Sequence, residues 1–311
     1  MAQSSDIILR LGSRGSPLAL TQARMVRDVL AKAHGFAPEQ VAIEVIRTSG
    51  DRIQDRPLAE AGGKGLFTKE LEEALVGGAI DLAVHSSKDM PTVLPPGLVL
   101  SAFLRREDPR DALISRKAAS IAGLPHGATV GTASLRRQAM LLRLRPDLVV
   151  VPLRGNVETR LRRLDEGVAD ATLLALAGLK RLGLTDAAAA VLDVDEFLPA
   201  VGQGAIGIET RADDSRTRDW LKPINHADTA TALAAERAFL AVLDGSCRTP
   251  IGGHATIAKG TLRFRGMVVK PDGSEAFETT REGKVADAEA LGADAGAELK
   301  ARAGSDFFAK L

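Results

Sequence analysis

Five loops of the sequence place cationic side chains beside serine, glycine or backbone N–H groups, where a predicted strand ends and a helix begins. The loops are Ser13–Ser16, His85–Asp89, Thr132–Arg137, Arg154–Asn156 with Arg160 one turn later, and Lys180–Arg181. Ligands of open α/β sheets bind at the carboxyl ends of strands, next to helix N-termini. One cation in a surface loop is usually only a solvated charge. Five at equivalent positions predict a cleft that binds a polyanion.

Asp89 is the acidic exception in these cationic loops, directly after Lys88. A lone carboxylate among cations stays ionised and can stabilise a protonated or iminium-like nitrogen. The alternative is a structural role, since aspartate often caps turns and the segment MPTVLPPG that follows has a turn composition. The residues alone leave both open. For the neighbouring Asp81 we expect a structural role, and for His85 a place in the core.

Cys247, the single cysteine, lies in the segment LDGSCRTPIGGHA beside Arg248. A free cysteine inside a helix or strand usually behaves as a small hydrophobic residue. Here glycine, serine and proline surround it, so the backbone can bring the thiol close to a partner. The loop permits a role in attachment, and an ordinary free thiol is the alternative.

Motifs for nucleotide and metal binding are missing from the sequence. GGKG at Gly62–Gly65 lacks the spacing of a P-loop, and GQGAIG at Gly202–Gly207 leads into a strand-like run instead of a helix. The five histidines are scattered, and no histidine or cysteine pair has the spacing of metal ligands. We therefore expect neither a dinucleotide site nor a metal.

Composition restricts the class of protein further. A net charge of +1 and 3% aromatic residues argue against a nucleic-acid-binding protein. The chain has no apolar run long enough to span a membrane. Its N-terminus lacks the pattern of a signal peptide, and one cysteine excludes an internal disulfide framework. We expect a cytoplasmic protein. Of its 41 basic residues only 12 are lysine; coding bias could explain this, but arginine also suits carboxylates and phosphates.

Strand, loop and helix alternate along most of the chain. Ile7–Ser13 is a predicted strand, Ser16-Pro17 begins a helix that runs to Ala33, and Thr48–Gly65 is a predicted mobile loop. The charged segment Arg105–Asp111 is a break, after which three more strand–helix units follow. A glycine-rich crossing then leads into another strand, and the C-terminal part combines an alanine-rich helix, strands joined by tight turns and a last helix.

This alternation predicts an α/β fold with parallel sheets and helices on both faces. We expect two doubly wound domains that flank a cleft, and a small α+β C-terminal domain. The predicted boundaries are 1–104 with 200–221 for the first domain, 105–199 for the second and 222–311 for the third.

The sequence resembles the porphobilinogen deaminase (hydroxymethylbilane synthase) family over essentially its whole length. The segments that carry the resemblance are RGSPLAL, GGKGLFTKELE, DLAVHSSKDMPT, REDPRDA, VGTASLRRQ, LRGNVETRL, LAGLKRLGL, LPAVGQGAIGIE and GSCRTPIGG. The resemblance implies an enzyme of tetrapyrrole and haem biosynthesis. It would join four porphobilinogen molecules head to tail, release ammonia and form the linear hydroxymethylbilane. The first two domains would resemble two-lobed anion-binding proteins.

The resemblance also implies roles for single residues. A dipyrromethane cofactor would be attached through a thioether to Cys247. Asp89 would be the catalytic carboxylate, and Lys88 beside it would be a catalytic residue as well. Gln203 would lie near the hinge and the cofactor. Carboxylates of substrate and cofactor would be bound by Arg14, Ser16, Lys64, Thr132, Ser134, Arg136, Arg137, Arg154, Arg160 and Arg181.

Each pyrrole ring of such a chain carries two carboxylates. Because arginine binds carboxylates well, this would explain the high arginine content. The expected partner is therefore the small molecule porphobilinogen, without nucleic acid, membrane or metal, and nothing in the sequence demands more than a monomer. The alternative is a non-catalytic, two-lobed anion-binding protein, which the same fold and cationic cleft would suit.

Overall fold

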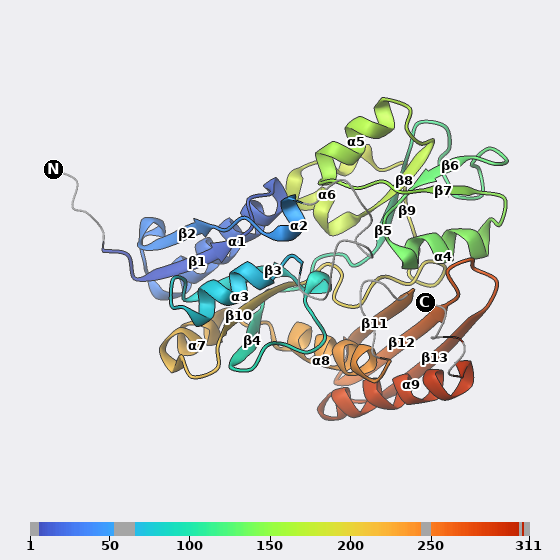
Figure 1. The fold of residues 1–311 in the computed structure, drawn as a ribbon. Coiled ribbons are helices and arrows are strands. Elements are labelled where there is room, and N and C mark those ends of the chain that lie inside the picture. Colours follow the sequence, from blue (N-terminus) through green and yellow to red (C-terminus); the bar gives the residue numbers. More distant parts are fainter. Residues whose placement is uncertain (1–5, 53–65, 244–249, 305–306, 308–311) are drawn as a thin grey trace. The chain divides into compact units, whose positions relative to one another are not determined.

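The computed structural model describes residues 6–52, 66–243, 250–304 and 307. They fall into two compact units (Figure 1), of which the first holds residues up to 52, 66–106 and 205–230, and the second holds 107–204 and those from 231 onward. Lys64, Cys247 and most of the predicted loop Thr48–Gly65 lie outside the described residues. The predicted boundaries of three domains stay a prediction.

The first unit is built on a five-stranded sheet with the order β2-β1-β3-β10-β4. Its strands are β1 (Leu9–Ser13), β2 (Val41–Val45), β3 (Leu82–Ser86), β4 (Leu98–Phe103) and β10 (Ile206–Arg211). Its helices are α1 (Pro17–His34), α2 (Ser49–Arg52), α3 (Lys69–Val76), α7 (Ser215–Leu221) and the first turn of α8 (Ala227–Val242). Apolar clusters on both faces make it a buried sheet, with α1 on one face and α3 on the other.

The second unit contains a similar sheet with the order β7-β6-β8-β5-β9. Its strands are β5 (Asp111–Ser115), β6 (Thr129–Gly131), β7 (Val149–Val151), β8 (Ala171–Ala175) and β9 (Ala190–Val191). The helices α4 (Leu135–Leu144), α5 (Val157–Asp165) and α6 (Leu176–Leu182) follow β6, β7 and β8 in turn. Each of these helices begins just beyond the carboxyl end of its strand, as the sequence predicts.

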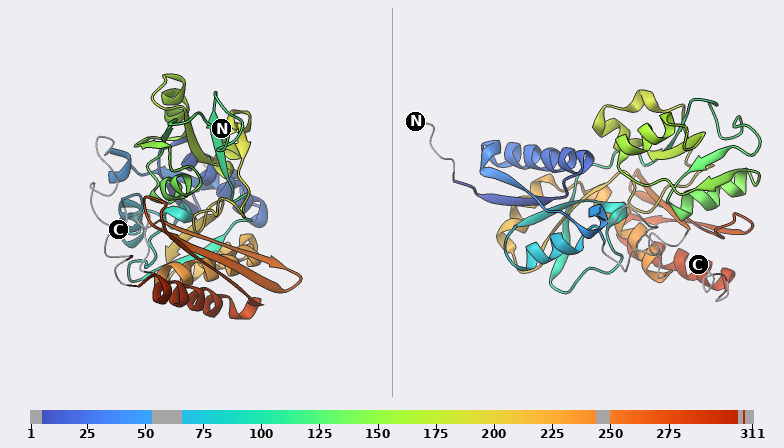
Figure 2. Two further views of the ribbon diagram at one scale, coloured as in Figure 1. Left: turned by 90° about the vertical axis from the view of Figure 1, so that its right-hand side faces the viewer. Right: turned by 45° about the horizontal axis from the view of Figure 1, so that its top comes forward.

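A third sheet also belongs to the second unit. It is an antiparallel meander of β11 (Ile251–Ala258), β12 (Thr261–Val269) and β13 (Ala276–Lys284). The helix α9 (Ala288–Ala303) lies along this sheet (Figure 2), and together with α8 it encloses an apolar core around Phe239 and Phe264. Met267 and Val269 of β12 join the core beneath α4, so this sheet packs against the preceding one.

The α/β class, with two sheet-based lobes and a small α+β part, is confirmed, but the prediction of parallel sheets is wrong in part. β10 runs antiparallel to β3 and β4, and β5 runs antiparallel to β8 and β9. These strands enter their sheets without the right-handed crossover helix that keeps neighbours parallel. The loop prediction for Thr48–Gly65 is also wrong at its start, where α2 forms a single helical turn.

Candidate active site

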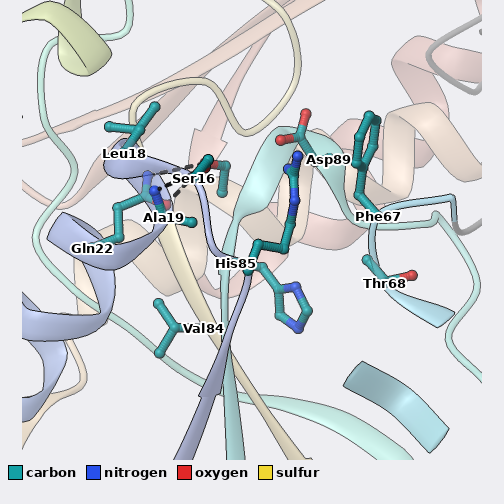
Figure 3. Close-up of a pocket in the computed structure, with 11 residues that line it drawn as sticks. Ser16, Leu18, Ala19, Gln22, Phe67, Thr68, Val84, His85 and Asp89 are labelled. Atoms are coloured by element: carbon teal, nitrogen blue, oxygen red, sulfur yellow. Dashed lines mark hydrogen bonds between the residues drawn. The ribbon is translucent and has the colours of Figure 1, made fainter. Parts of the chain in front are cut away.

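A pocket opens in the first unit at the carboxyl ends of its parallel strands (Figure 3). It is lined by Arg14, Ser16, Leu18, Ala19, Gln22, Phe67, Thr68, Val84, His85, Ser86 and Asp89. Three of the predicted site residues, Arg14, Ser16 and Asp89, are therefore brought together.

The first wall of the pocket is formed where β1 turns into α1. Ser16 caps the helix, because its hydroxyl accepts a hydrogen bond from the N–H of Ala19 at 3.3 Å and Pro17 occupies the first helical position. Arg14 precedes the cap, and its guanidinium carbon lies 4.2 Å from the centre of the Phe67 ring. A cation over an aromatic face is attracted by the ring and held in place there.

Asp89 also lines the pocket, at the end of a 3-10 turn, Ser87–Asp89, that directly follows β3. This turn is closed through the backbone, by a 3.3 Å bond from the N–H of Met90 to the carbonyl of Ser87. The Asp89 side chain is exposed and accepts no hydrogen bond within the described parts of the chain. The carboxylate therefore does not cap the turn. Lys88 is half-buried on the same turn.

Beneath the pocket lies a buried polar pair. Nε2 of His85 is 3.1 Å from a carboxylate oxygen of Glu209, and these side chains are 3% and 0% exposed. Glu72 of α3 is buried beside them; burial raises its pKa, and the nearby Glu209 carboxylate raises it further. His85 is thus a core residue with a satisfied nitrogen, as expected. Asp81 is structural too, since it accepts a bond from the N–H of Arg10 at 2.7 Å.

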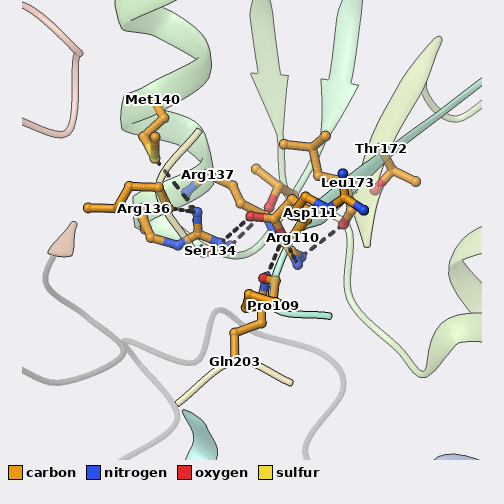
Figure 4. Close-up of polar contacts among 12 residues, drawn as sticks. Pro109, Arg110, Asp111, Ser134, Arg136, Arg137, Met140, Thr172, Leu173 and Gln203 are labelled. Atoms are coloured by element: carbon orange, nitrogen blue, oxygen red, sulfur yellow. Dashed lines mark hydrogen bonds and ion pairs between the residues drawn. The ribbon is translucent and has the colours of Figure 1, made fainter. Parts of the chain in front are cut away.

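In the second unit, Arg136 and Arg137 surround a single buried carboxylate, that of Asp111 (Figure 4). The distance from Nη2 of each arginine to Asp111 is 2.7 Å. Nε of Arg137 and the amide nitrogen of Gln203 lie 3.0 and 3.1 Å from the same carboxylate. Burial by itself would raise the pKa of Asp111, but the two guanidiniums hold it well below its ordinary value.

The other donors of the two arginines bind backbone carbonyls. Nη1 of Arg136 donates to Leu198 and Nη1 of Arg137 donates to Leu173, both at 2.8 Å. Nε of Arg136 is the exception, since it is buried and none of the residues in 6–52, 66–243, 250–304 or 307 offers it a hydrogen bond. Burial lowers the pKa of Arg136.

The remaining predicted residues of this unit lie around the same strand ends. Thr132 accepts a bond from the N–H of Ser134 at 3.1 Å, and Ser134 caps α4 through the N–H of Arg137. Arg154 and Arg160 are half-buried where β7 leads into α5, and Nε of Arg160 donates to the carbonyl of Gly155 at 2.9 Å.

Arg181 and Gln203 bind backbone carbonyls near the two ends of the segment 107–204 of the second unit. Nη2 of Arg181 donates to the carbonyl of Gly204 at 2.6 Å, while its Nε is buried and makes no hydrogen bond to any residue that the structure describes. Burial lowers the pKa of this arginine. Gln203 is 1% exposed and also donates to the carbonyl of Pro109 at 2.7 Å.

Sequence reasoning did not find Asp111 or Phe67. Asp111 was placed in a charged break, although it is the first residue of β5 and fully buried. The apolar run DALIS that it opens was the available signal. For Phe67, the aromatic ring at the entrance of a helix gave no clue that it would lie under Arg14. Within the described residues, no three His, Cys, Asp or Glu side chains are grouped to hold a metal ion.

Comparisons with known proteins agree with one another. A family model described as porphobilinogen deaminase, dipyromethane cofactor binding domain, matches residues 9–219, and one described as porphobilinogen deaminase, C-terminal domain, matches residues 230–301. The porphobilinogen deaminase of Nitrobacter winogradskyi is 64% identical over 99% of this chain and 97% of its own length. That of Nitrobacter hamburgensis is 64% identical over 98% and 96%.

Among solved structures, the methionine binding protein MetQ is similar to 74% of this chain and 94% of its own, with 17% identity and a TM-score of 0.45. No functional argument follows from a likeness of that size. No helix in the described part of the chain is long and apolar enough to cross a membrane.

Proposed function

The chain belongs to the porphobilinogen deaminase family, and on that premise we propose that Asp89 is its catalytic carboxylate. Enzymes of this family join porphobilinogen units head to tail with loss of ammonia, and this chain is such a transferase of tetrapyrrole biosynthesis. The alternative of a non-catalytic anion-binding protein is thereby excluded. The proposal concerns which side chains carry out the reaction.

The observation that supports the role of Asp89 is its free carboxylate in the pocket of the first unit. When ammonia leaves the aminomethyl group of porphobilinogen, positive charge develops on the ring and its nitrogen. An ionised carboxylate beside that nitrogen stabilises the charge, and it can accept the proton released when the new carbon–carbon bond has formed. Arg14 and Ser16 share the pocket and provide donors for the acetate and propionate groups.

The cofactor of the family is a dipyrromethane, covalently attached through a cysteine, and Cys247 is the only cysteine of the chain. When bound, it would supply the ring carbon that attacks the first unit and would anchor the growing chain, whose terminal ring attacks each later unit. Its carboxylates suit the donors in the second unit, because Nε of Arg136 and Nε of Arg181 are buried and have no hydrogen-bond partner among the described residues. Buried donors of that kind are matched by an anionic acceptor.

We assign the binding of cofactor and substrate carboxylates to the side chains that the resemblance predicts at the strand ends. Lys88 completes the turn that carries Asp89, and Gln203 orients the buried carboxylate of Asp111. The full carboxylate-binding set is Arg14, Ser16, Lys64, Thr132, Ser134, Arg136, Arg137, Arg154, Arg160 and Arg181.

We further propose a cytoplasmic, metal-free monomer. A single cysteine suits a reducing compartment, and neither ammonia loss nor attack by the pyrrole carbon requires a metal in this scheme. Light scattering coupled to size exclusion tests the monomer, and elemental analysis of the active enzyme tests the absence of metal.

Asp89→Asn tests the catalytic assignment. The amide has the same shape but carries no charge, so we expect the variant to retain the cofactor in an intact-mass measurement while turnover falls at least 100-fold. Asp213→Asn is the control, since Asp213 is an exposed aspartate of the same unit that does not line the pocket. Turnover of Asp89→Asn close to that of the control would refute the role.

A further inference from the structure

The cluster around Asp111 contains more positive than negative charge. Two guanidiniums, Arg136 and Arg137, form their ion pairs with one carboxylate, and all three side chains are at most 6% exposed. Within the described residues, no other acid forms an ion pair with either arginine. The cluster therefore carries a net charge of about +1 in a region that excludes water. A buried charge without a counterion is unfavourable unless an anion neutralises it.

The carboxylate of Asp111 accepts four hydrogen bonds from residues that the structure describes. One of its oxygens accepts bonds from Nε and Nη2 of Arg137 and from Gln203, and the other accepts from Arg136. Asp111 is also fixed by its backbone, because it pairs with Ala175 as the first residue of β5. Its carboxylate is thus a rigid part of the sheet.

Arg136 is the member of the cluster with an unused donor. Its Nη atoms are hydrogen-bonded to Asp111 and to the carbonyl of Leu198, whereas Nε is buried and has no partner in the part of the chain that the structure describes. The guanidinium carbon lies 5.6 Å from the centre of the Phe197 ring, which supports the group from a side that offers no acceptor. An unsatisfied, charged donor beside an unbalanced charge marks the place where an anionic ligand would be stabilised.

We propose that Asp111 is a positioning residue for cofactor binding: it holds Arg136 and Arg137 in place and neutralises one of their two charges, so that the other is left for one carboxylate of the ligand. This inference rests on the proposed carboxylate-binding role of the two arginines. The inference adds Asp111 as a residue that acts through Arg136 and Arg137. It also explains why the site has two arginines: one charge is neutralised by Asp111, and the second binds the ligand.

Two variants separate this role from a purely structural one, both in a Cys247→Ser background that cannot attach the cofactor. Arg136→Gln leaves one arginine with one aspartate and thus no net charge, so we expect its thermal midpoint to stay within about 3 °C of the parent. Asp111→Asn leaves two buried guanidiniums without a counterion, so we expect a loss of more than about 6 °C.

Propionate resembles the carboxylate side chains of the cofactor. It is therefore the probe for the guanidinium charge that Asp111 does not neutralise. In the Cys247→Ser parent, we expect saturating propionate to raise the thermal midpoint by about 3 °C relative to chloride of equal ionic strength. The shift should vanish in Arg136→Gln. In Asp111→Asn it should grow, because a second charge is then unbalanced. If Asp111→Asn does not fold, Asp111→Glu serves instead; its charge is retained but displaced, and we expect a smaller propionate shift than in the parent.

Loading of the cofactor completes the test, with Cys247 restored. We expect the intact mass of Arg136→Gln and of Asp111→Glu, in which the arginines are displaced, to show the adduct at less than one tenth of the wild-type fraction. The inference is overturned if Arg136→Gln is destabilised as strongly as Asp111→Asn, or if Asp111→Glu loads fully. Full loading of Arg136→Gln would instead overturn the carboxylate-binding role of that arginine, so the two failures are distinguishable.

Discussion

Nε2 of His85 lies 3.1 Å from a carboxylate oxygen of Glu209, and these two side chains are buried directly beneath the pocket that contains Asp89. Their meeting depends on the antiparallel pairing of β3 with β10. His85 is opposite Gly207, which has no side chain, so the diagonal neighbour Glu209 can reach across to the ring. The pair thereby joins β3, which leads to the turn that carries Asp89, to β10, which lies more than 120 residues further along the chain.

His85→Ala should lower the free energy of unfolding by about 3 kcal/mol, since it leaves a carboxylate buried without its partner. His34→Ala is the matched control. His34 is half-buried in the same unit and makes one bond to the carbonyl of Trp220 at 2.8 Å, so its loss should cost about 1 kcal/mol. Urea unfolding measures both. Equal losses in the two variants would mean that the buried pair adds nothing beyond an ordinary hydrogen bond.

Glu72→Gln should change how stability depends on pH. The ordinary pKa of this residue is 4.5, and burial raises it in the folded chain. The folded state then holds the proton more tightly than the unfolded state, so the wild type loses stability as pH rises from about 4.5 through the folded pKa. The glutamine variant lacks that loss.

Relative to the wild type, Glu72→Gln should therefore be more stable at pH 7 than at pH 4. Glu73→Gln, on the exposed side of the same helix, should follow the wild type at both pH values, because its ion pair with Lys69 is solvated. Denaturant titrations at the two pH values measure the difference. If the difference in unfolding free energy between the wild type and Glu72→Gln is the same at both pH values, the prediction is contradicted.

The sequence was sufficient to place Arg14, Ser16 and Asp89 in one pocket, because parallel strands bring their carboxyl ends to one edge of a sheet. It was not sufficient for Glu209 or Asp111. Each lies on an antiparallel strand that joins its sheet from a distant part of the chain, so local periodicity carries no information on its neighbours. Asp111 also follows a run of charges typical of an exposed loop, and the partners that permit its burial, Arg136, Arg137 and Gln203, lie 25, 26 and 92 residues further on.

Phe67→Leu should raise KM for porphobilinogen about two- to fivefold with little change in kcat. Leucine retains an apolar side chain but has no π face, so Arg14 loses a contact worth about 0.5–1 kcal/mol. Phe36→Leu is the control, as Phe36 stacks on His34 away from the pocket. Steady-state kinetics separate the constants. A fall in kcat at unchanged KM would show that the ring acts on the chemical step and not through the guanidinium.

Gly204→Ala should destabilise the chain more than its backbone conformation alone explains. Gly204 has a φ of +88°, and a Cβ there would lie 2.4 Å from the carbonyl oxygen of Glu107. The two segments are also joined by a 3.2 Å bond from the N–H of Glu107 to the carbonyl of Gly204, the carbonyl that Arg181 binds. A side chain would force them apart and move that arginine.

Gly167→Ala isolates the backbone contribution to this effect. Gly167 has a similar φ of +78° but open space around its Cα, so alanine there should cost only about 1 kcal/mol. We expect Gly204→Ala to cost at least about 2 kcal/mol more, since backbone carbonyls cannot yield as a flexible side chain can. Because Arg181 is displaced as well, cofactor loading measured by intact mass should fall in Gly204→Ala and stay complete in Gly167→Ala. Equal unfolding free energies for the two variants would show that the segments separate freely at this crossing.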